Sequence, residues 1–247
     1  MDVKNKLYKN QGIHVITALF TVEQGVTKVL LIKRKNKPFQ GDWVLTGGAL
    51  YNNEDLETGA LREIKEKTGI TNVNIKQFKA FGKVDRSPIM RMVAIGFIGV
   101  IDSNRVKVLR ETENTSNADW FPINKIPPLG FDHNEILEDA LVELQHLIVK
   151  TNILKSLFPD GVTIPELQKT YEAILNRKFD RRNFRKKILN LDLIDDTNTS
   201  DKFGGNKPAK VYQFKNEIED KDIFWFESVM LLRRVIIDDK NFYRSNA

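Results

Sequence analysis

The chain has 247 residues, of which 41% are hydrophobic and 29% are charged, and its formal net charge is +6. This length and composition are typical of a folded protein with one or two domains, and they exclude collagen-like and low-complexity proteins. The absence of cysteine excludes disulfides, thiolate metal sites and cysteine nucleophiles. The N-terminal apolar run is too short and too mixed for a signal peptide, and no later run reaches the length of a membrane helix. We therefore expect a cytoplasmic protein without membrane contact.

Three strand-like runs open the chain, at residues 14–22, 29–33 and 43–45. Arg34 and Lys35 follow the second run, where they either hold a phosphate or protect an edge strand. Trp43 in the third run either stacks on an adenine or fills the core. The glycine pair Gly47 and Gly48 then predicts a loop that leads into a helix.

The segment from Gly48 to Ile70 carries the most specific pattern in the chain. Its residues stand at fixed spacings across a loop and a helix, at Gly48, Glu54, Arg62, Glu63, Ile64, Glu66, Gly69 and Ile70. Residues three and four apart share a helix face, so positions 63, 66 and 67 point the same way. Lys67 is therefore placed to pair with Glu63. The alternative interpretation is an amphipathic surface helix whose charged groups lie on the solvent side.

This segment resembles the Nudix box, in which position 67 is a glutamate. The resemblance implies an α/β/α sandwich in which Glu54 and Arg62 brace the loop and three carboxylates bind Mg²⁺. Lys67 removes one ligand and repels the cation, so we expect metal binding at Glu63 and Glu66 to be weak or absent. We expect no required cofactor and no catalytic residues in this degenerate box, whose relevant positions are Gly48, Glu54, Arg62, Glu63, Glu66 and Lys67.

Further strand-like runs follow at 73–81, 90–101 and 120–121, before a Pro127-Pro128 break. Asp132 and Glu135 have the spacing of a capping box in front of a helical periodicity. Strands flanked by helices therefore predict an α/β/α sandwich of the Nudix type over residues 1–152, and the resemblance described below implies a ligand-sensing role for it. No second ligand stands at metal spacing from any histidine, so we expect structural roles for His14, His133 and His146.

A second unit is predicted over residues 153–216. Thr163 and Glu166 form a capping box in front of one helix. A second helix begins at Asp180, and its apolar positions predict a helix-turn-helix with a core side at Phe184, Ile188 and Leu191. A strand at 193–194, a glycine-containing loop and a strand at 211–214 then resemble the wing of a winged helix.

The second helix of this unit is strongly basic. Between residues 177 and 190, seven lysines and arginines stand against one aspartate, a surplus of six that equals the net charge of the whole chain. Arg182, Arg185, Lys186 and Asn190 point away from the apolar side, and Arg181 lies at its edge. A solvated charged face is the alternative, but the agreement of cap, helix and wing favours binding of double-stranded DNA.

The order of a Nudix-like domain, a basic helix-turn-helix and a hairpin ending in NKPAKVYQF resembles the Nudix-related transcriptional regulators of bacterial NAD metabolism or sugar use. The segments 84–88 and 131–133 resemble that family as well. Its members often carry an eroded box and bind ADP-ribose or a related ligand without hydrolysing it. The resemblance implies a homodimeric regulator, a repressor, that binds a palindromic operator and responds to a nucleotide or a sugar.

The expected contacts follow from these two resemblances. The effector is expected at Arg34, Gly47, Gly48, Arg62, Glu63, Glu66, Asp85 and Arg86, and DNA at Thr163, Arg181, Arg182, Arg185, Lys186, Lys207 and Lys210. One alternative is a Mg²⁺-dependent hydrolase of ADP-ribose or another nucleoside diphosphate, and another is a protein-interaction module. Residues 217–247 form a C-terminal extension, in which the apolar stretch 223–237 is expected to be helical.

Overall fold

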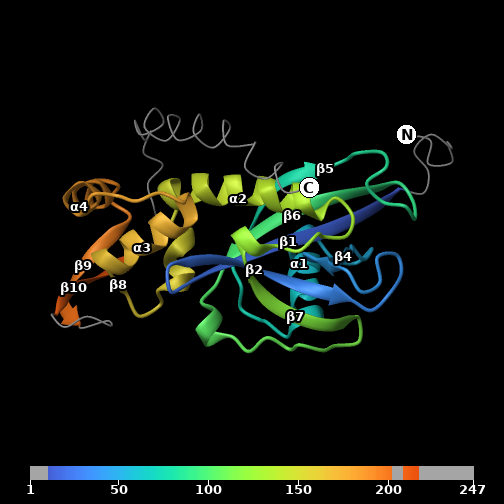
Figure 1. The fold of residues 1–247 in the computed structure, drawn as a ribbon, viewed down its shortest axis with the longest axis horizontal. Coiled ribbons are helices and arrows are strands. Elements are labelled where there is room, and N and C mark those ends of the chain that lie inside the picture. The colour runs from blue at the N-terminus through green and yellow to red at the C-terminus, as the bar shows by residue number, and fades with distance from the viewer. Residues whose placement is uncertain (1–10, 202–207, 217–247) are drawn as a thin grey trace. The chain divides into compact units, whose positions relative to one another are not determined.

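The computed structural model describes residues 11–201 and 208–216, and the stretch expected to be helical at 223–237 lies outside them. The described residues contain a seven-stranded mixed sheet with flanking helices and a three-stranded sheet with two helices of its own (Figure 1). In this part of the chain, no helix combines the length and the apolar character needed to cross a membrane.

The larger sheet is built from apolar runs rich in β-branched residues. Its first two strands, β1 (Gly12–Glu23) and β2 (Val26–Arg34), form a hairpin whose two turn residues, Gln24 and Gly25, both have positive φ. The other strands are β3 (Trp43–Val44), β4 (Thr46–Ala49), β5 (Ile75–Phe81), β6 (Met92–Val100) and β7 (Thr115–Pro122). The main order is β3-β2-β1-β6-β5, with β4 paired to β1 and β7 paired to β2.

Both faces of the central strand β1 are buried. Successive residues of a strand point to opposite faces, and the side chains of Val15, Ile16, Ala18, Leu19 and Phe20 are all fully buried. The helices that flank this sheet are α1 (Leu56–Thr68) and α2 (His133–Lys150). The predicted Nudix-type α/β/α sandwich is therefore confirmed.

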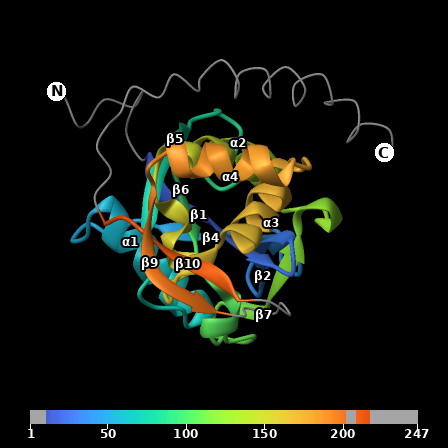
Figure 2. The same ribbon diagram turned by 90° about the vertical axis from the view of Figure 1, so that its left-hand side faces the viewer.

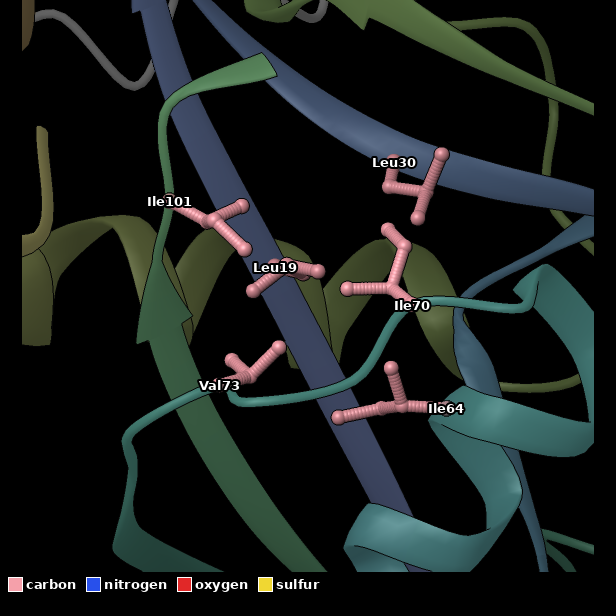
Figure 3. Close-up of a cluster of buried hydrophobic side chains, with 6 residues drawn as sticks. All are labelled: Leu19, Leu30, Ile64, Ile70, Val73 and Ile101. Carbon is pink, nitrogen blue, oxygen red and sulfur yellow. The ribbon is translucent and has the colours of Figure 1, made fainter. Parts of the chain in front are cut away.

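The apolar residues of the box attach α1 to the sheet. Ile64 of α1 and the following Ile70 pack into a cluster with Leu19, Leu30, Val73 and Ile101 (Figure 3). Burying one aliphatic side chain of this size contributes about 1.5–3 kcal/mol to stability. Gly69 ends the helix with a φ of 74° and donates its N–H to the carbonyl of Lys65 at 2.8 Å. These box positions are thus explained by folding alone.

The glycine pair lies in a strand, so the predicted loop at this position is wrong. Gly47 and Gly48 belong to β4, which pairs with β1 at Ile16 and Val15. The connection into α1 is the segment 50–55, and Asp55 caps the helix by accepting the N–H of Thr58 at 2.8 Å. Strand propensity at two glycines is weak, and the pairing with β1 lies more than thirty residues away in sequence.

The edge-strand interpretation of Arg34 and Lys35 is also wrong. β2 pairs with β7 on one side and with β1 and β3 on the other, so it is an interior strand. The ammonium of Lys35 pairs with Glu111 at 2.9 Å. Trp43 packs edge-on against Phe121, with 4.7 Å between the ring centroids, as its packing interpretation expects.

The capping box predicted at Asp132 and Glu135 does not form. Asp132 precedes α2, but its carboxylate accepts two hydrogen bonds from the buried guanidinium of Arg86, at 2.8 and 2.9 Å. Glu135 pairs with Lys83 instead. A buried guanidinium without a partner costs more free energy than an uncapped helix end, so the long-range ion pair takes the carboxylate.

The C-terminal part of the described residues has the arrangement of a winged helix, with two helices and a three-stranded sheet (Figure 2). Its helices are α3 (Ile164–Leu175) and α4 (Arg181–Asn190). Its three strands are β8 (Val162–Thr163), β9 (Ile194–Asp201) and β10 (Ala209–Phe214), and they lie in the order β8-β10-β9 in the sheet. The capping box of Thr163 and Glu166 is confirmed. Strand β9 extends well beyond the predicted 193–194. Short 3-10 helices lie at Ser103–Arg105, Ile123–Lys125 and Ile153–Leu157.

The turn between α3 and α4 is held by the carboxylate of Glu172. It accepts the backbone N–H of Phe179 at 3.0 Å and lies 2.9 Å from the ammonium of Lys178. The hydrogen bonds from Lys178, from Gln168 and from the Phe179 N–H hold the pKa of Glu172 down at about 2. These contacts fix the direction in which α4 leaves the turn.

Side chains also connect α2 with α3. The hydroxyl of Tyr171 donates to the carbonyl of Ile148, and the amide of Gln145 donates to the carbonyl of Ile174 at 3.0 Å. The described residues up to Asn216 fall within one unit. The domain boundary at residue 152 stays a prediction.

Candidate ligand pocket and nucleic-acid interface

A pocket with a volume of about 240 Å³ lies beside α1, near the ends of β2 and β4. Its walls come from Ile32, Arg34, Asn36, Gly48, Ala49, Tyr51, Glu63, Glu66, Lys67 and Asn114. The structure therefore brings together four residues expected at the effector, Arg34, Gly48, Glu63 and Glu66. The sequence did not predict the contributions of Lys67, of Tyr51, or of Asn36 and Asn114, which share a hydrogen bond of 3.0 Å.

The carboxylate of Glu63 lies on the backbone of β4. The residue is only 6% exposed, and one carboxylate oxygen accepts a hydrogen bond from Arg62 at 2.7 Å. The other oxygen is 2.9 Å from the ammonium of Lys67. A Cβ atom on Gly48 would lie within 2.1–2.3 Å of this carboxylate. Only glycine leaves room for it, so Gly48 and Glu63 depend on each other.

Lys67 links the box helix to the strand beneath it. Its ammonium donates a hydrogen bond to the carbonyl of Gly47 and pairs with Glu63, one helical turn away. The predicted pairing of Lys67 with Glu63 is therefore confirmed. The lysine side chain is 13% exposed, so its charge lies in the pocket wall and not in bulk solvent.

Glu54 and Arg62 brace the loop at 50–55. The guanidinium of Arg62 donates to both carboxylate oxygens of Glu54, at 2.8 and 2.7 Å, and to the carbonyl of Ala49 at 2.9 Å. Glu54 in turn accepts the N–H of Tyr51 at 2.8 Å, and the Arg62 guanidinium lies 3.8 Å from the centre of the Tyr51 ring. The hydrogen bond from Arg62 is the main cause that lowers the pKa of Glu54 to about 2. This is the bracing that the Nudix resemblance implies.

The residues in the pocket do not fit a Mg²⁺ site. Among residues 11–201 and 208–216, no group of three or more histidine, cysteine, aspartate and glutamate side chains is placed to hold a metal ion. Both oxygens of Glu63 face cations, and Glu66 lies 3.3 Å from Arg62. Mg²⁺ requires near-octahedral oxygen coordination, so a site with a resident ammonium lacks the ligands that the ion needs.

Two histidines near the pocket are held neutral. His133 accepts the backbone N–H of Leu45 through Nδ1 at 3.0 Å, and burial followed by nearby positive charge lowers its pKa well below the ordinary value. The pKa of His14, on β1, is lowered to about 3 by burial and then by the charges of Lys67, Arg86 and Arg34. Both shifts agree with the structural roles expected for these histidines.

The four other residues expected at the effector do not line this pocket. Arg86 is buried in its ion pair with Asp132, while Asp85 is exposed in the preceding loop. The carbonyl of Gly47 accepts a hydrogen bond from Lys67, and the guanidinium of Arg62 donates one to Glu63. A direct contact of these residues with a ligand stays a prediction.

The outward face of α4 is cationic. Phe184 and Ile188 are buried, with Phe184 packed on Tyr171 at 5.5 Å between ring centroids. The side chains on the opposite side are exposed, namely Arg181, Arg182, Arg185 and Lys186. The predicted division of the helix into two faces is therefore confirmed, although Leu191 is only half-buried because it ends the helix.

A second hollow of about 260 Å³ lies at the start of α3, beside α4 and β10. Its lining is Ile164, Pro165, Arg181, Arg185, Pro208, Ala209 and Lys210. Arg185 lies 3.4 Å from the hydroxyl of Tyr212, and Lys210 pairs with Asp196 at 2.6 Å. Cations of α4, at Arg181 and Arg185, and of the wing strand, at Lys210, therefore line one hollow.

One residue expected at DNA is buried, and another lies outside the described residues. Thr163 is buried, and its hydroxyl donates to Glu166 at 2.8 Å within the helix cap. Lys207 lies outside the described residues. Contacts of Thr163 and Lys207 with DNA stay predictions.

Two family models match the chain in the order of these two sites. Residues 12–140 match the NUDIX domain, and residues 155–214 match the NrtR DNA-binding winged helix domain. The first match spans the sheet, α1 and the pocket. The second match spans α3, α4 and the wing.

One curated relative matches most of the chain, and another matches about half of it. The "ADPR responsive transcriptional repressor NtrR" of Acinetobacter baylyi is 29% identical over 211 residues, which cover 84% of this chain and 83% of that protein. The "ADP-ribose pyrophosphatase" of Methanocaldococcus jannaschii is 33% identical over 138 residues, which cover 56% of this chain and 78% of that protein.

Solved structures of Shewanella oneidensis NrtR resemble both sites. NrtR complexed with a 27mer DNA is 27% identical to this chain, and the two structures align with a TM-score of 0.69. The alignment covers 82% of this chain and 93% of that chain. The NUDIX domain of the same protein, complexed with ADP ribose, is 31% identical and aligns with a TM-score of 0.52. That alignment covers 56% of this chain and 92% of that chain.

The neutral histidines predict a loss of stability in mild acid. His14 has a pKa of about 3 in the folded protein and close to 6.5 in the unfolded chain. Between these values the unfolded chain binds more protons, so the free energy of unfolding falls as the pH drops below 6.5, by up to about 1.4 kcal/mol per pH unit for each such histidine. Urea unfolding at about pH 7.5 and pH 5.5 measures this loss, above the range in which most carboxylates titrate.

The variant His14→Gln isolates one histidine in this experiment. It is expected to fold at the higher pH and to lose less stability on acidification than the unchanged protein. An equal loss in both proteins would contradict the assignment of the pH dependence to His14.

Proposed function

Because the chain belongs to the Nudix family and carries a winged helix of the NrtR type after its Nudix domain, we propose that it is a ligand-responsive, DNA-binding repressor. The observation that carries the proposal is the exposed cationic face of α4, set on a helix-turn-helix whose opposite face is packed. Acting on DNA, such a regulator works in the cytoplasm.

The basic helix α4 enters the major groove of double-stranded DNA in this proposal. Arg182, Arg185 and Lys186 divide between phosphates and base edges, since arginine pairs with guanine through two hydrogen bonds and lysine contacts phosphate as a point charge. We expect Lys207 and Lys210 to contact the DNA backbone. Shewanella oneidensis NrtR was crystallised in complex with a 27mer DNA, which supports double-stranded DNA as the partner.

The proposed regulator acts as a homodimer on a palindromic operator. One winged helix offers few base contacts, and a second copy doubles them while fixing the spacing of the two half-sites. The half-sites should lie one or two helical turns apart, which is roughly 34–70 Å.

The Nudix domain serves as the sensor in this proposal, and ADP-ribose is the first candidate effector. Arg34, Asn36 and Asn114 supply polar groups to the pocket, and Tyr51 supplies an aromatic ring. The Acinetobacter baylyi relative is described as ADPR-responsive, and the Shewanella oneidensis NUDIX domain was crystallised with ADP ribose. A related nucleotide or a sugar is the alternative effector, and no cofactor is required.

A hydrolase is the second candidate function. The Methanocaldococcus jannaschii relative is named an ADP-ribose pyrophosphatase, and Glu63 and Glu66 remain in this chain. Against this, the pocket holds Lys67 where the Nudix box has its third carboxylate, and its two remaining carboxylates already face cations. The geometry therefore favours a sensor over an enzyme.

We expect the purified protein to hydrolyse ADP-ribose negligibly in the presence of Mg²⁺, because the metal site lacks one anionic ligand and contains a cation. Release of AMP and ribose phosphate measures the turnover. A turnover number of about 1 per second or more, as in typical enzymes, would establish the hydrolase instead.

Substitution of Arg185 or Lys186 by alanine should weaken operator binding while leaving the free energy of unfolding unchanged within about 0.5 kcal/mol, because both side chains are exposed. Binding of the unchanged protein should fall steeply with salt, with a slope of about 0.9 per phosphate contact on a double-logarithmic plot. Fluorescence anisotropy with labelled duplex DNA measures both effects. The exposed Lys76 of β5 is the control, and Lys76→Ala should bind as the unchanged protein does.

Phe184→Ala tests the opposite face of the same helix. Its buried ring packs on Tyr171 and Phe179, so its removal should cost about 3–5 kcal/mol in the winged helix. A fully stable Phe184→Ala variant with intact DNA binding would show that the two faces of α4 are assigned wrongly.

ADP-ribose should lower the affinity for operator DNA by about 5- to 150-fold, a coupling free energy of roughly 1–3 kcal/mol. A ligand shifts the protein only by its differential affinity for the free and DNA-bound arrangements. By reciprocity, DNA must weaken ADP-ribose binding by the same factor. Calorimetry of ADP-ribose, and of pentose sugars as competing candidates, with and without DNA measures this coupling. Equal affinities in both conditions for every ligand would refute the sensor.

A further inference from the structure

A lysine at position 67, in place of the glutamate of the Nudix box, makes the charge of the pocket more positive by two units. A glutamate carries −1 and a lysine carries +1, so the exchange adds +2, which is the charge of one Mg²⁺ ion. With Lys67, the pocket wall holds two cationic and two anionic side chains, at Arg34, Lys67, Glu63 and Glu66. With a glutamate at position 67 the same wall would carry a net charge of −2 and would need a metal ion before it could accept an anion.

The ammonium of Lys67 is fixed in place. It lies between the carbonyl of Gly47 and the carboxylate of Glu63, on a side chain with little exposure. Oxygens that would otherwise be available to a cation therefore hold an ammonium that belongs to the chain. Because the site is partly shielded from water, its charge acts on a neighbouring anion more strongly than an exposed lysine would.

The surroundings show the effect of this charge. Lys67 is the largest electrostatic contribution after burial to the lowered pKa of His14, and Arg86 and Arg34 follow it. Lys67 and Arg86 each also have a carboxylate partner.

We propose that Lys67 is the built-in cation of this pocket, which binds the phosphates of a nucleoside diphosphate effector without a divalent metal. This inference rests on the proposed function, in which the pocket is the effector site. Lys67 neutralises one phosphate as a point charge, while Arg34 offers a planar guanidinium to the other. Specificity follows from this arrangement, since the pocket selects a metal-free diphosphate.

Calorimetry of ADP-ribose with the full-length protein tests the proposal directly, in EDTA and in millimolar MgCl₂. The dissociation constant should agree within about twofold in the two buffers, because the charge of one metal ion is already supplied by the protein. A dissociation constant that tightens by about tenfold or more with Mg²⁺ would overturn the proposal. This comparison needs no variant, so it does not depend on how any substitution folds.

Lys67→Gln should weaken ADP-ribose binding by at least about tenfold in EDTA. The matched control is Lys65→Gln, an exposed lysine on the same helix, which should bind as the unchanged protein does. Wild-type affinity in a folded Lys67→Gln variant would refute the role of Lys67. Thermal unfolding comes first, because Glu63 loses one of its cationic partners in that variant.

Lys67→Glu supplies the converse test. It restores a third carboxylate beside Glu63 and Glu66, so ADP-ribose binding should then require a divalent ion, and Mn²⁺ should bind with a detectable paramagnetic signal. Binding of ADP-ribose to this variant in EDTA with unchanged affinity would contradict the proposal. If the unchanged protein binds ADP-ribose in neither buffer, the proposed sensor function fails, whereas metal-dependent binding by the unchanged protein removes only the role of Lys67.

Discussion

The buried carboxylate of Glu63 fixes the box helix on the strand beneath it. It lies against the Cα of Gly48 and is held by Arg62 on one side and Lys67 on the other. Breaking a buried ion pair by removal of one partner costs about 3–5 kcal/mol, because an uncompensated charge is left behind. The four residues therefore form one unit, in which a change at any position alters the demands on the others.

This arrangement separates the fold from the chemistry that the Nudix box supports. The apolar positions Ile64 and Ile70 pack into the core, and Arg62 braces the loop through Glu54. None of these contacts involves position 67. A lysine at that position consequently leaves the helix, the loop and the pocket in place while it occupies the surroundings of the carboxylates. Such a pocket retains the means to hold a ligand, but it offers one carboxylate fewer than the Nudix box does to the metal that activates water.

Local spacing in the sequence predicted much of this structure. The pairing of Lys67 with Glu63 and the two faces of α4 follow from the helical period, which sequence states directly. The cap of Thr163 and Glu166 is likewise set within four residues. Each of these features depends on neighbours in the chain, so no tertiary information was needed.

The features that sequence missed depend on distant contacts. Asn36 and Asn114 meet in the pocket although 78 residues separate them. Asp132 was expected to cap α2, but Arg86, 46 residues away, takes its carboxylate. Strand β4 forms because β1 offers it a partner, against the weak strand propensity of Gly47 and Gly48. Register and long-range ion pairs have no period from which they can be predicted.

The cation of the pocket and the cationic face of α4 differ in their exposure to solvent, and salt therefore screens their charges to different extents. Lys67 is shielded and already bonded to Gly47 and Glu63, so dissolved ions screen it little. Arg182 and Lys186 of α4 are exposed to water, where a screening length of about 10 Å at 0.1 M salt limits the range of their electrostatic interactions. The binding of DNA to such residues also releases counterions, which makes it depend on salt. We therefore expect salt to act mainly on the binding of DNA by α4 and much less on the shielded charge of Lys67.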